Sequence, residues 1–324
     1  MTSILVYVGL DLVGDGVMKL PFLSALRRLY PEARITWLAG QGKTVYAGVL
    51  APLLSGLVEE VIQEAGIGLS AWELISRPLG GRRFDLVIDT QRRVVTSLIL
   101  KRIPHGKFIS AAAGWALSDA VPKSGKAKRS SMIGQMVALL EAASGAEVPV
   151  PPPVRLAPDL LAEAERRLPA GPRYVGLAPG AGGKHKCWPL GNYLDIGVRL
   201  AAEGLAPVFL IGPAERDWEI GLRAALPDAI FPLTDSDGPP VTMALGTRLS
   251  AAVANDSGTG HMLAAAGVPL LSLFGPTPPA KFAPAAERLT VIRAQDFGAE
   301  DMAAIPVEPV MAALRLLLEV SPQP

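Results

Sequence analysis

Short apolar runs alternate with segments of helical periodicity along the whole chain, and this alternation is what most constrains the fold. Residues 4–8, Phe84–Asp89 and Tyr174–Ala178 are apolar runs of the length and composition typical of buried strands. The segments between such runs, for example 190–202, have the apolar spacing of helices. The pattern predicts βαβ units and mostly parallel sheets, which places the chain in the α/β class.

A proline-rich segment divides this alternation into two series. Residues 148–154 contain four prolines in seven residues, which favours a stiff extended connector over a helix or a central strand. A chain of 324 residues is long enough for about two domains. We expect two Rossmann-like, doubly wound domains, 1–150 and 151–324, with an interdomain cleft between the carboxyl ends of their strands. The sequence leaves open whether the final helix, at 307–318, packs back on the first domain.

The composition excludes several classes of protein. Half of the residues are hydrophobic and only 19% are charged, unlike a disordered chain. Cys187 is the single cysteine, so no intramolecular disulfide can form and a cysteine zinc site is excluded. The apolar start lacks a preceding basic region, and no uninterrupted apolar run is long enough to span a membrane. We therefore expect a cytoplasmic protein.

The charges are unevenly distributed. Residues 1–155 hold 18 Lys and Arg against 12 Asp and Glu, while residues 156–324 hold 13 against 18. The excess in the first half lies in residues 82–129, with eleven basic and three acidic side chains. Such a region favours an anionic partner, although a solvated basic face is the alternative. Aromatic interleaving and known nucleic-acid motifs are missing from it, so we expect no nucleic-acid partner.

Two loops have the composition of phosphate-binding loops. Residues 179–189 follow an expected strand and contain three glycines with Lys184 and Lys186; glycine amides, a helix N-terminus and lysine ammonium groups all bind phosphate. Residues 255–261, Asn-Asp-Ser-Gly-Thr-Gly-His, again follow a strand. Their hydroxyls and glycines suit a diphosphate, and Asp256 suits sugar hydroxyls. The alternatives are a flexible surface loop for the first and a helix cap at Asp256 for the second.

Two further carboxylates follow expected strands. Glu215 suits a ribose diol, as acids at this position do in dinucleotide folds; the alternative is an acid favoured by the helix dipole. Asp15, in the loop at 9–16, is a candidate general base. The alternative for Asp15 is a plain helix N-cap.

Taken in order, four motifs resemble glycosyltransferase family 9, the ADP-heptose:lipopolysaccharide heptosyltransferases. The motifs are Gly14-Asp15 with residues 20–28 and 31–35, residues 179–181 with 186–189, residues 255–261, and residues 273–277. The resemblance implies a GT-B fold and sugar transfer with inversion, with no metal or other cofactor. The chain differs from the family pattern at Gly9, Asp11 and Leu12, where the family has a basic residue and serines, and at Cys187, where it has arginine.

The resemblance also implies roles for individual residues. Asp15 matches the general base, Lys186 the lysine that contacts phosphate, and Glu215 the acid on the nucleoside side. The expected donor-phosphate residues are Lys186, Ala181, Gly182, Ser257, Gly258 and Thr259; the expected nucleoside and sugar residues are Glu215, Asp256 and His261. The expected acceptor residues are Asp11, Arg92, Arg93, Lys123, Lys126, Lys128 and Arg129.

The expected substrates are ADP-heptose and an anionic glycolipid, the lipopolysaccharide core. We accordingly expect peripheral association with the cytoplasmic face of the inner membrane. Two alternatives stay open: the same fold with another nucleotide-sugar donor or acceptor, and a protein that binds a nucleotide sugar without turning it over.

Overall fold

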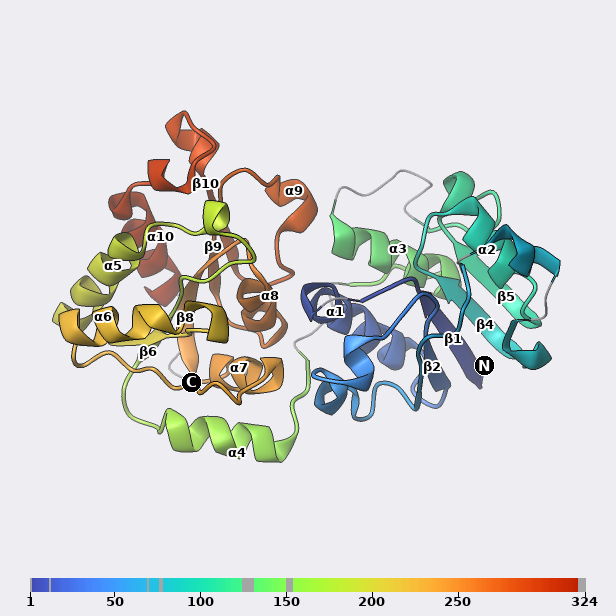
Figure 1. Cartoon of the computed structure of the whole chain (residues 1–324), viewed down its shortest axis with the longest axis horizontal. Helices are drawn as coiled ribbons and strands as arrows, with labels where there is room; N and C mark the ends of the chain where they lie inside the picture. Colours follow the sequence, from blue (N-terminus) through green and yellow to red (C-terminus); the bar gives the residue numbers. More distant parts are fainter. Residues whose placement is uncertain are drawn as a thin grey trace. The chain divides into compact units, whose positions relative to one another are not determined.

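The chain folds into two compact units, each built around a parallel sheet (Figure 1). The computed structural model describes residues 2–11, 13–68, 70–75, 78–123, 131–149 and 154–319. The units comprise Met1–Pro152 and Pro153–Pro324. Most of the proline-rich connector, residues 150–153, lies outside the described residues.

The first unit has the strand order β3-β2-β1-β4-β5, and all of its neighbouring strands are parallel. Its strands are β1 (Ser3–Val8), β2 (Arg34–Ala39), β3 (Glu60–Ile62), β4 (Phe84–Asp89) and β5 (His105–Ser110), and its α-helices are α1 (Val13–Leu29), α2 (Val94–Leu100) and α3 (Met132–Ser144). The apolar run at 4–8 is fully buried in the central strand, as expected for a strand covered on both faces.

The second unit has the strand order β10-β9-β8-β6-β7, again all parallel. Its strands are β6 (Tyr174–Ala178), β7 (Ala206–Phe209), β8 (Leu249–Asn255), β9 (Leu270–Phe274) and β10 (Leu289–Arg293). Its α-helices are α4 (Pro158–Arg167), α5 (Leu190–Ala202), α6 (Asp217–Ala225), α7 (Pro239–Gly246), α8 (Gly258–Ala265), α9 (Pro279–Phe282) and α10 (Val307–Glu319). A parallel bridge between Val208 and Ile230 adds one position outside β7. With that bridge counted as a position, the second sheet has the order 3-2-1-4-5-6 of a Rossmann fold, and the first sheet has the same order without the sixth strand.

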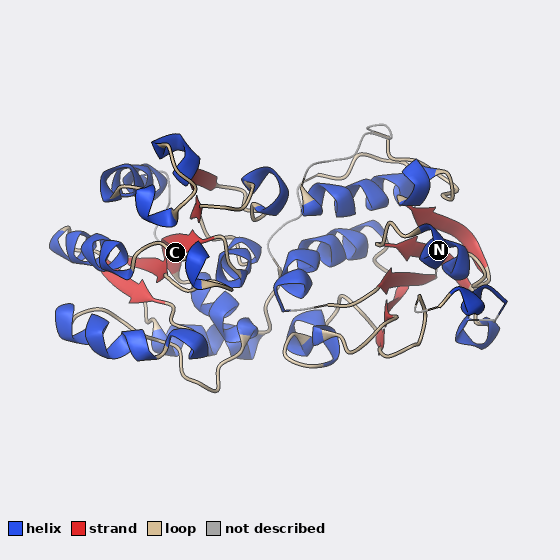
Figure 2. Cartoon of the chain, turned by 45° about the horizontal axis from the view of Figure 1, so that its top comes forward, coloured by secondary structure: helices blue, strands red, loops and turns tan. Residues whose placement is uncertain are grey.

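Helices lie on both sides of the strands in each unit (Figure 2), which confirms the α/β class. The last helix, α10, packs on the sheet of its own unit: Val310 and Leu314 are buried in one cluster with Val253 and Leu271. The sequence left the position of this helix open, and in the structure it covers the second sheet. Its apolar residues recur every three to four positions, so that one face of the helix is covered by the second sheet.

Some elements differ from the expectations. Helix α1 begins at Val13, inside the loop expected at 9–16, and α8 begins at Gly258, inside the loop expected at 255–261. The glycines in both segments favour loops when the sequence is considered alone. In α1, however, a glycine is needed inside the helix, because a Cβ at Gly16 would lie 2.6 Å from the side chain of Val45. Strand β5 was not expected, since polar residues interrupt its apolar pattern.

None of the helices in the described ranges is long and apolar enough to cross a membrane.

Each sheet has one point at which the strand order reverses, between β1 and β4 in the first unit and between β6 and β8 in the second. In open α/β sheets, ligands bind outside the carboxyl ends of the strands at this point. The loops that begin at residues 9, 90, 179 and 256 leave these four strand ends. Three of these loops, those after β1, β6 and β8, are also ones that the sequence singled out.

Candidate functional site

In the second unit, the side chain of Asn255 joins the two loops at the reversal point. Its Nδ2 donates to the carbonyl oxygen of Pro179 at 2.7 Å, and its Oδ1 accepts from the backbone N–H of Trp188 at 3.1 Å and from the Tyr193 hydroxyl at 3.1 Å. The Asn255 side chain is fully buried, so all of these bonds are formed away from water. Sequence reasoning did not assign Asn255 a role of its own; its position as the last residue of β8 was the available signal.

Lys186 and Asp256 meet across the two loops. The Lys186 Nζ lies 2.8 Å from Asp256 Oδ2, and the same oxygen accepts a hydrogen bond from the Thr277 hydroxyl at 2.6 Å. The Asp256 side chain is nearly buried, whereas Lys186 keeps about a quarter of its side chain exposed. The fixed Asp256 carboxylate thus holds the ammonium group, while part of the Lys186 side chain remains accessible to solvent. Thr277 was part of a sequence motif, but its contact with Asp256 was not expected.

Helix α8 begins two residues after Asp256, the acidic partner in this ion pair. Ser257 is the N-cap residue, and its hydroxyl accepts from the Gly260 N–H at 3.3 Å; the cap is therefore Ser257 and not Asp256, the alternative raised from the sequence. Gly258 and Thr259, in the first turn, are partly exposed. The first amides of a helix have no intrahelical acceptor, and the helix dipole adds positive potential there. This turn can bind an anion.

The remaining predicted donor residues divide by exposure. Gly182 is exposed and Ala181 half-buried, so both are accessible in the first loop. His261 is buried within α8, which separates it from the accessible turn at its start. Trp188 is also buried, and its indole N–H donates to the Ile305 carbonyl at 2.9 Å. Its packing role agrees with the interpretation drawn from the sequence.

Glu215 reaches the first loop from the end of β7. A Cβ at Gly180 would lie 2.7 Å from the Glu215 carboxyl carbon, and one at Gly212 would lie 3.0 Å from a carboxyl oxygen. Both glycines therefore leave the room that this side chain occupies. Partial burial raises the pKa of the Glu215 carboxyl. The arrangement puts an acid between the two loops that leave β6 and β7.

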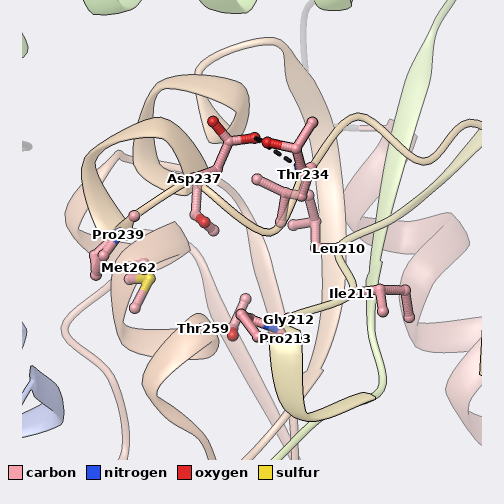
Figure 3. A pocket seen from close by; sticks show the side chains of 12 residues that line it. Leu210, Ile211, Gly212, Pro213, Thr234, Asp237, Pro239, Thr259 and Met262 are labelled. Atoms are coloured by element: carbon pink, nitrogen blue, oxygen red, sulfur yellow. Dashed lines mark hydrogen bonds between the residues drawn. The ribbon is translucent and has the colours of Figure 1, made fainter. Parts of the chain in front are cut away.

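A cavity of about 200 Å³ opens next to these groups (Figure 3). Its lining comes from the end of β7, the turn before α7 and the start of α8, and comprises Leu210, Ile211, Gly212, Pro213, Leu233, Thr234, Asp237, Gly238, Pro239, Thr242, Thr259 and Met262. This volume is below the roughly 300–1,000 Å³ of pockets for drug-sized ligands, so it suits one fragment of a larger ligand. Sequence reasoning missed the cavity; the turn-forming residues at 234–240 were the signal.

The floor of the cavity is braced from outside. Arg167 on α4 donates to the Pro232 carbonyl at 2.8 Å and pairs with Asp237, whose Oδ2 accepts from both the N–H and the hydroxyl of Thr234. The Thr234 to Asp237 bond is drawn in Figure 3. These contacts fix the turn before α7. Because Thr259 lines the cavity and also begins α8, the cavity and the anion-binding turn are continuous.

In the first unit, Asp15 lies in the first turn of α1 and is half-buried. Asp11 behaves differently from the expectation that it binds an acceptor. Its carboxylate is fully buried, pairs with Lys19, and accepts hydrogen bonds from the Trp37 indole at 3.1 Å and the Thr44 hydroxyl at 3.0 Å. Asp11 therefore holds the loop after β1 in place. Because this carboxylate is buried and already paired, the structure does not present Asp11 to an acceptor, contrary to the expectation from the sequence.

The basic region divides into structural and accessible residues. Arg82 pairs with Glu60, and the Lys107 ammonium donates to the carbonyls of Ala142 and Ala143 at the end of α3, so these charges are used within the fold. Arg92 and Arg93, in the segment between β4 and α2, are exposed, as is Lys123. The other expected acceptor residues, Lys126, Lys128 and Arg129, fall outside the described residues.

The buried carboxyl of Asp89, the last residue of β4, should make the stability of the fold depend on pH. Burial raises the pKa of its carboxyl to about 6, although Ser97, Ser110 and the Gln91 N–H all donate to it. The folded state therefore holds this proton more tightly than the unfolded state, whose pKa is about 3.9. The resulting stability is complete below that value and is lost as the pH rises through about 6.

We expect Asp89→Asn to remove this dependence. Between pH 4 and pH 7, the free energy of unfolding of the variant should rise relative to that of the wild type by up to about 3 kcal/mol. Urea denaturation of both proteins across this range measures the difference. A difference that stays constant with pH would show that folding does not raise the pKa of the Asp89 carboxyl.

Comparisons with known proteins agree with these loops and this topology. The family model described as glycosyltransferase family 9 (heptosyltransferase) matches residues 72–304. Lipooligosaccharide heptosyltransferase 2 of Haemophilus influenzae is 28% identical over 88% of this chain and 87% of its own length, and lipopolysaccharide heptosyltransferase 3 of Escherichia coli is 24% identical over 94% and 95%.

Two solved structures resemble the whole chain. The glycosyl transferase family 9 structure from Veillonella parvula has a TM-score of 0.75 at 18% identity and covers 99% of this chain and 98% of its own. The E. coli heptosyltransferase WaaC with ADP has a TM-score of 0.69 at 17% identity, with coverages of 98% and 100%. Together with the two parallel sheets, these likenesses confirm the GT-B fold.

Proposed function

Because the chain belongs to glycosyltransferase family 9, we propose that it transfers heptose from ADP-heptose to an anionic lipopolysaccharide-type core, with inversion at the sugar. The match of the family model over residues 72–304 and the heptosyltransferase relatives identify the chain as a glycosyltransferase. The donor and the acceptor are the proposal. One observation carries it: cavity, acid, anion-binding turn and lysine follow one another along the carboxyl edge of the second sheet.

The order of these groups matches the parts of a nucleoside diphosphate sugar. The cavity of about 200 Å³ receives the base, and the Glu215 carboxylate accepts from the ribose hydroxyls. The first turn of α8 and the Lys186 ammonium bind the diphosphate. Asp256, fixed by Thr277, keeps one carboxylate oxygen for a hydroxyl of the transferred sugar.

Asp15 acts as the general base in the proposed reaction. It removes the proton from an acceptor hydroxyl as that oxygen forms a bond to the anomeric carbon of the donor. The bond between this carbon and the diphosphate oxygen breaks, and its electron pair leaves with the nucleoside diphosphate. Lys186 and the α8 amides stabilise the negative charge that develops on the departing phosphate. The acceptor oxygen attacks opposite the leaving group, so the configuration inverts.

The accessible cations of the first unit support an anionic acceptor. Arg92 and Arg93 follow β4 at the reversal point of the first sheet, on the edge where the loop after β1 also begins. Guanidinium groups bind phosphates and carboxylates in a fixed, forked geometry. A phosphorylated glycolipid fits this chemistry, and it places the enzyme at a membrane surface.

A calorimetric titration with nucleotides tests the donor. We expect ADP to bind, and UDP and GDP to bind at least about tenfold more weakly, because one small cavity selects one base. NAD carries the same base as ADP, so its titration tests whether the site accepts a second nucleoside on the diphosphate. Binding of a different nucleotide would replace the donor and retain the fold and chemistry. Consumption of ADP-heptose in the presence of a core acceptor then separates a transferase from a protein that only binds the donor.

Thr277 supplies a finer test of the donor site. In Thr277→Val, Asp256 loses one hydrogen bond, so Lys186 is held less firmly and ADP affinity should fall by about fivefold. Thr277→Ser keeps the hydroxyl and should bind ADP as the wild type does. A loss in Thr277→Ser with none in Thr277→Val would show that the methyl group, and not the hydroxyl, is what the site needs.

A further inference from the structure

Helix α2 buries both of its polar side chains together with Ile99 and Leu100, and it exposes its other three apolar side chains. Thr96 and Ser97 are buried, and the Ser97 hydroxyl donates to the Asp89 carboxylate at 2.5 Å. Val94, Val95 and Leu98 are 45%, 47% and 38% exposed. A helix that only covers a protein core has polar side chains on its outer face. The outward apolar side chains of α2 therefore indicate a partner outside this chain's own core.

Cations surround this apolar face. Arg92 and Arg93 precede α2, and Lys101 and Arg102 follow it; all four are exposed. Between Asp89 and Asp119 the sequence contains no acidic residue. Lys101 lies 3.7 Å from Asp119 at the edge of the region. We call Val94, Val95 and Leu98, with these four basic residues, the α2 face.

Exposed aliphatic side chains surrounded by basic residues suit the interface of an anionic lipid bilayer. The boundary between lipid headgroups and acyl chains accepts aliphatic side chains, and anionic headgroups attract arginine and lysine nearby. A protein surface that needed only charge would not require the three exposed aliphatic residues, and nucleic acid would gain nothing from them. Ile75, 65% exposed, lies on the short helical turn Ala71–Ile75, which contacts α2 and extends the apolar area.

We propose that the α2 face docks on an anionic lipid bilayer, with Val94, Val95 and Leu98 in the headgroup region and the basic residues against lipid phosphates. The choice of a bilayer rests in part on the proposed function, since a glycolipid acceptor lies in one. Arg92 and Arg93 lie three and four residues after Asp89, the last residue of β4. Docking through α2 therefore brings one strand end of the reversal point in the first sheet close to the lipid surface.

The test is sedimentation of the full chain with vesicles of phosphatidylglycerol and phosphatidylcholine, and with vesicles of phosphatidylcholine alone. We expect binding to the anionic vesicles only. Val94→Ser with Leu98→Ser should weaken it by about tenfold or more. Arg92→Gln with Arg93→Gln should weaken it by about fivefold per charge at low salt, and less at high salt.

A matched control comes from the second unit. Ile220→Ser with Leu316→Ser replaces two aliphatic side chains that are more exposed, 78% and 64%, on α6 and α10, and should leave vesicle binding unchanged. Equal losses in both double variants, or none in the α2 variant, would overturn the proposal. So would a dimer in light scattering that the α2 variant dissociates, because the face would then bind a second copy.

The same samples separate this inference from the proposed function. Calorimetry with ADP should give wild-type affinity in the α2 variant, since the donor residues lie in the second unit. Binding of ADP without binding of vesicles would refute the docking surface alone. Binding of vesicles through the α2 face without binding of any nucleotide would refute the proposed donor and support the docking surface.

Discussion

Replacing Asp15 with asparagine is expected to lower kcat by about 10²- to 10⁴-fold and to leave ADP affinity unchanged. Asparagine has the shape of aspartate but cannot accept the proton of the attacking hydroxyl, and positioned general bases contribute about this factor. The donor groups proposed here, Glu215, Asp256 and Lys186, belong to the second unit. Steady-state rates of donor consumption and calorimetry with ADP measure the two quantities separately.

The alternative role of Asp15 has its own control. An acid in the first turn of a helix stabilises that helix through the dipole, by about 0.3–1 kcal/mol when exposed. Asp159 occupies the first turn of α4 and is exposed. Asp159→Asn should lose a similar stability and no activity. If Asp15→Asn behaves like Asp159→Asn in both measurements, Asp15 is a helix acid only, and the catalytic base lies elsewhere.

Lys186→Ala is expected to weaken ADP binding by about 10- to 100-fold and to lower kcat/KM by about 10²- to 10³-fold. A charge-assisted hydrogen bond to a phosphate contributes on the order of 1.5–3 kcal/mol to binding, and loss of a group that stabilises developing charge lowers the rate further. Lys184→Ala is the matched control, because Lys184 lies in the same short helical turn and is exposed. Its effect should stay below about threefold.

A second variant separates the phosphate contact from the pairing with Asp256. Lys186→Ala also leaves the nearly buried Asp256 carboxylate without its cation, which by itself disturbs the site. Lys186→Ala with Asp256→Asn removes both charges. If affinity for ADP returns to that of Asp256→Asn alone, Lys186 acts only as the partner of Asp256. If the double variant binds as weakly as Lys186→Ala, the lysine contacts the diphosphate itself.

Much of the fold could be predicted because strand and helix patterns are local. The bounds expected for β4 and β6 agree with the structure, since each is a short apolar run between turn residues. Strand β5 escaped this reasoning because Lys107 interrupts its pattern. The structure accounts for Lys107 by placing its ammonium on the carbonyls that end α3, about 35 residues farther along the chain.

The candidate site shows the same division. Residue types and their place after strands were enough to single out Asp256, Glu215 and Asp15, and the family resemblance chose Lys186 over Lys184. The cavity was not visible, because its lining comes from three segments that no sequence spacing connects. Asp11 was misjudged for a related reason: whether a carboxylate after a strand faces solvent depends on Trp37 and Thr44, which lie on the next βα unit.

The sequence by itself determined the α/β class, the two series of βαβ units, the family and the loops that carry its motifs, because periodicity, turn residues and motif spacing are properties of neighbouring residues. Only the tertiary structure decided which side chains meet. The hydrogen bond from Asn255 to Pro179 joins residues 76 positions apart, and Ser97 on α2 is buried because its hydroxyl donates to the buried carboxylate of Asp89. Contacts of this kind depend on strand order and burial, which arise from the packing of the whole unit.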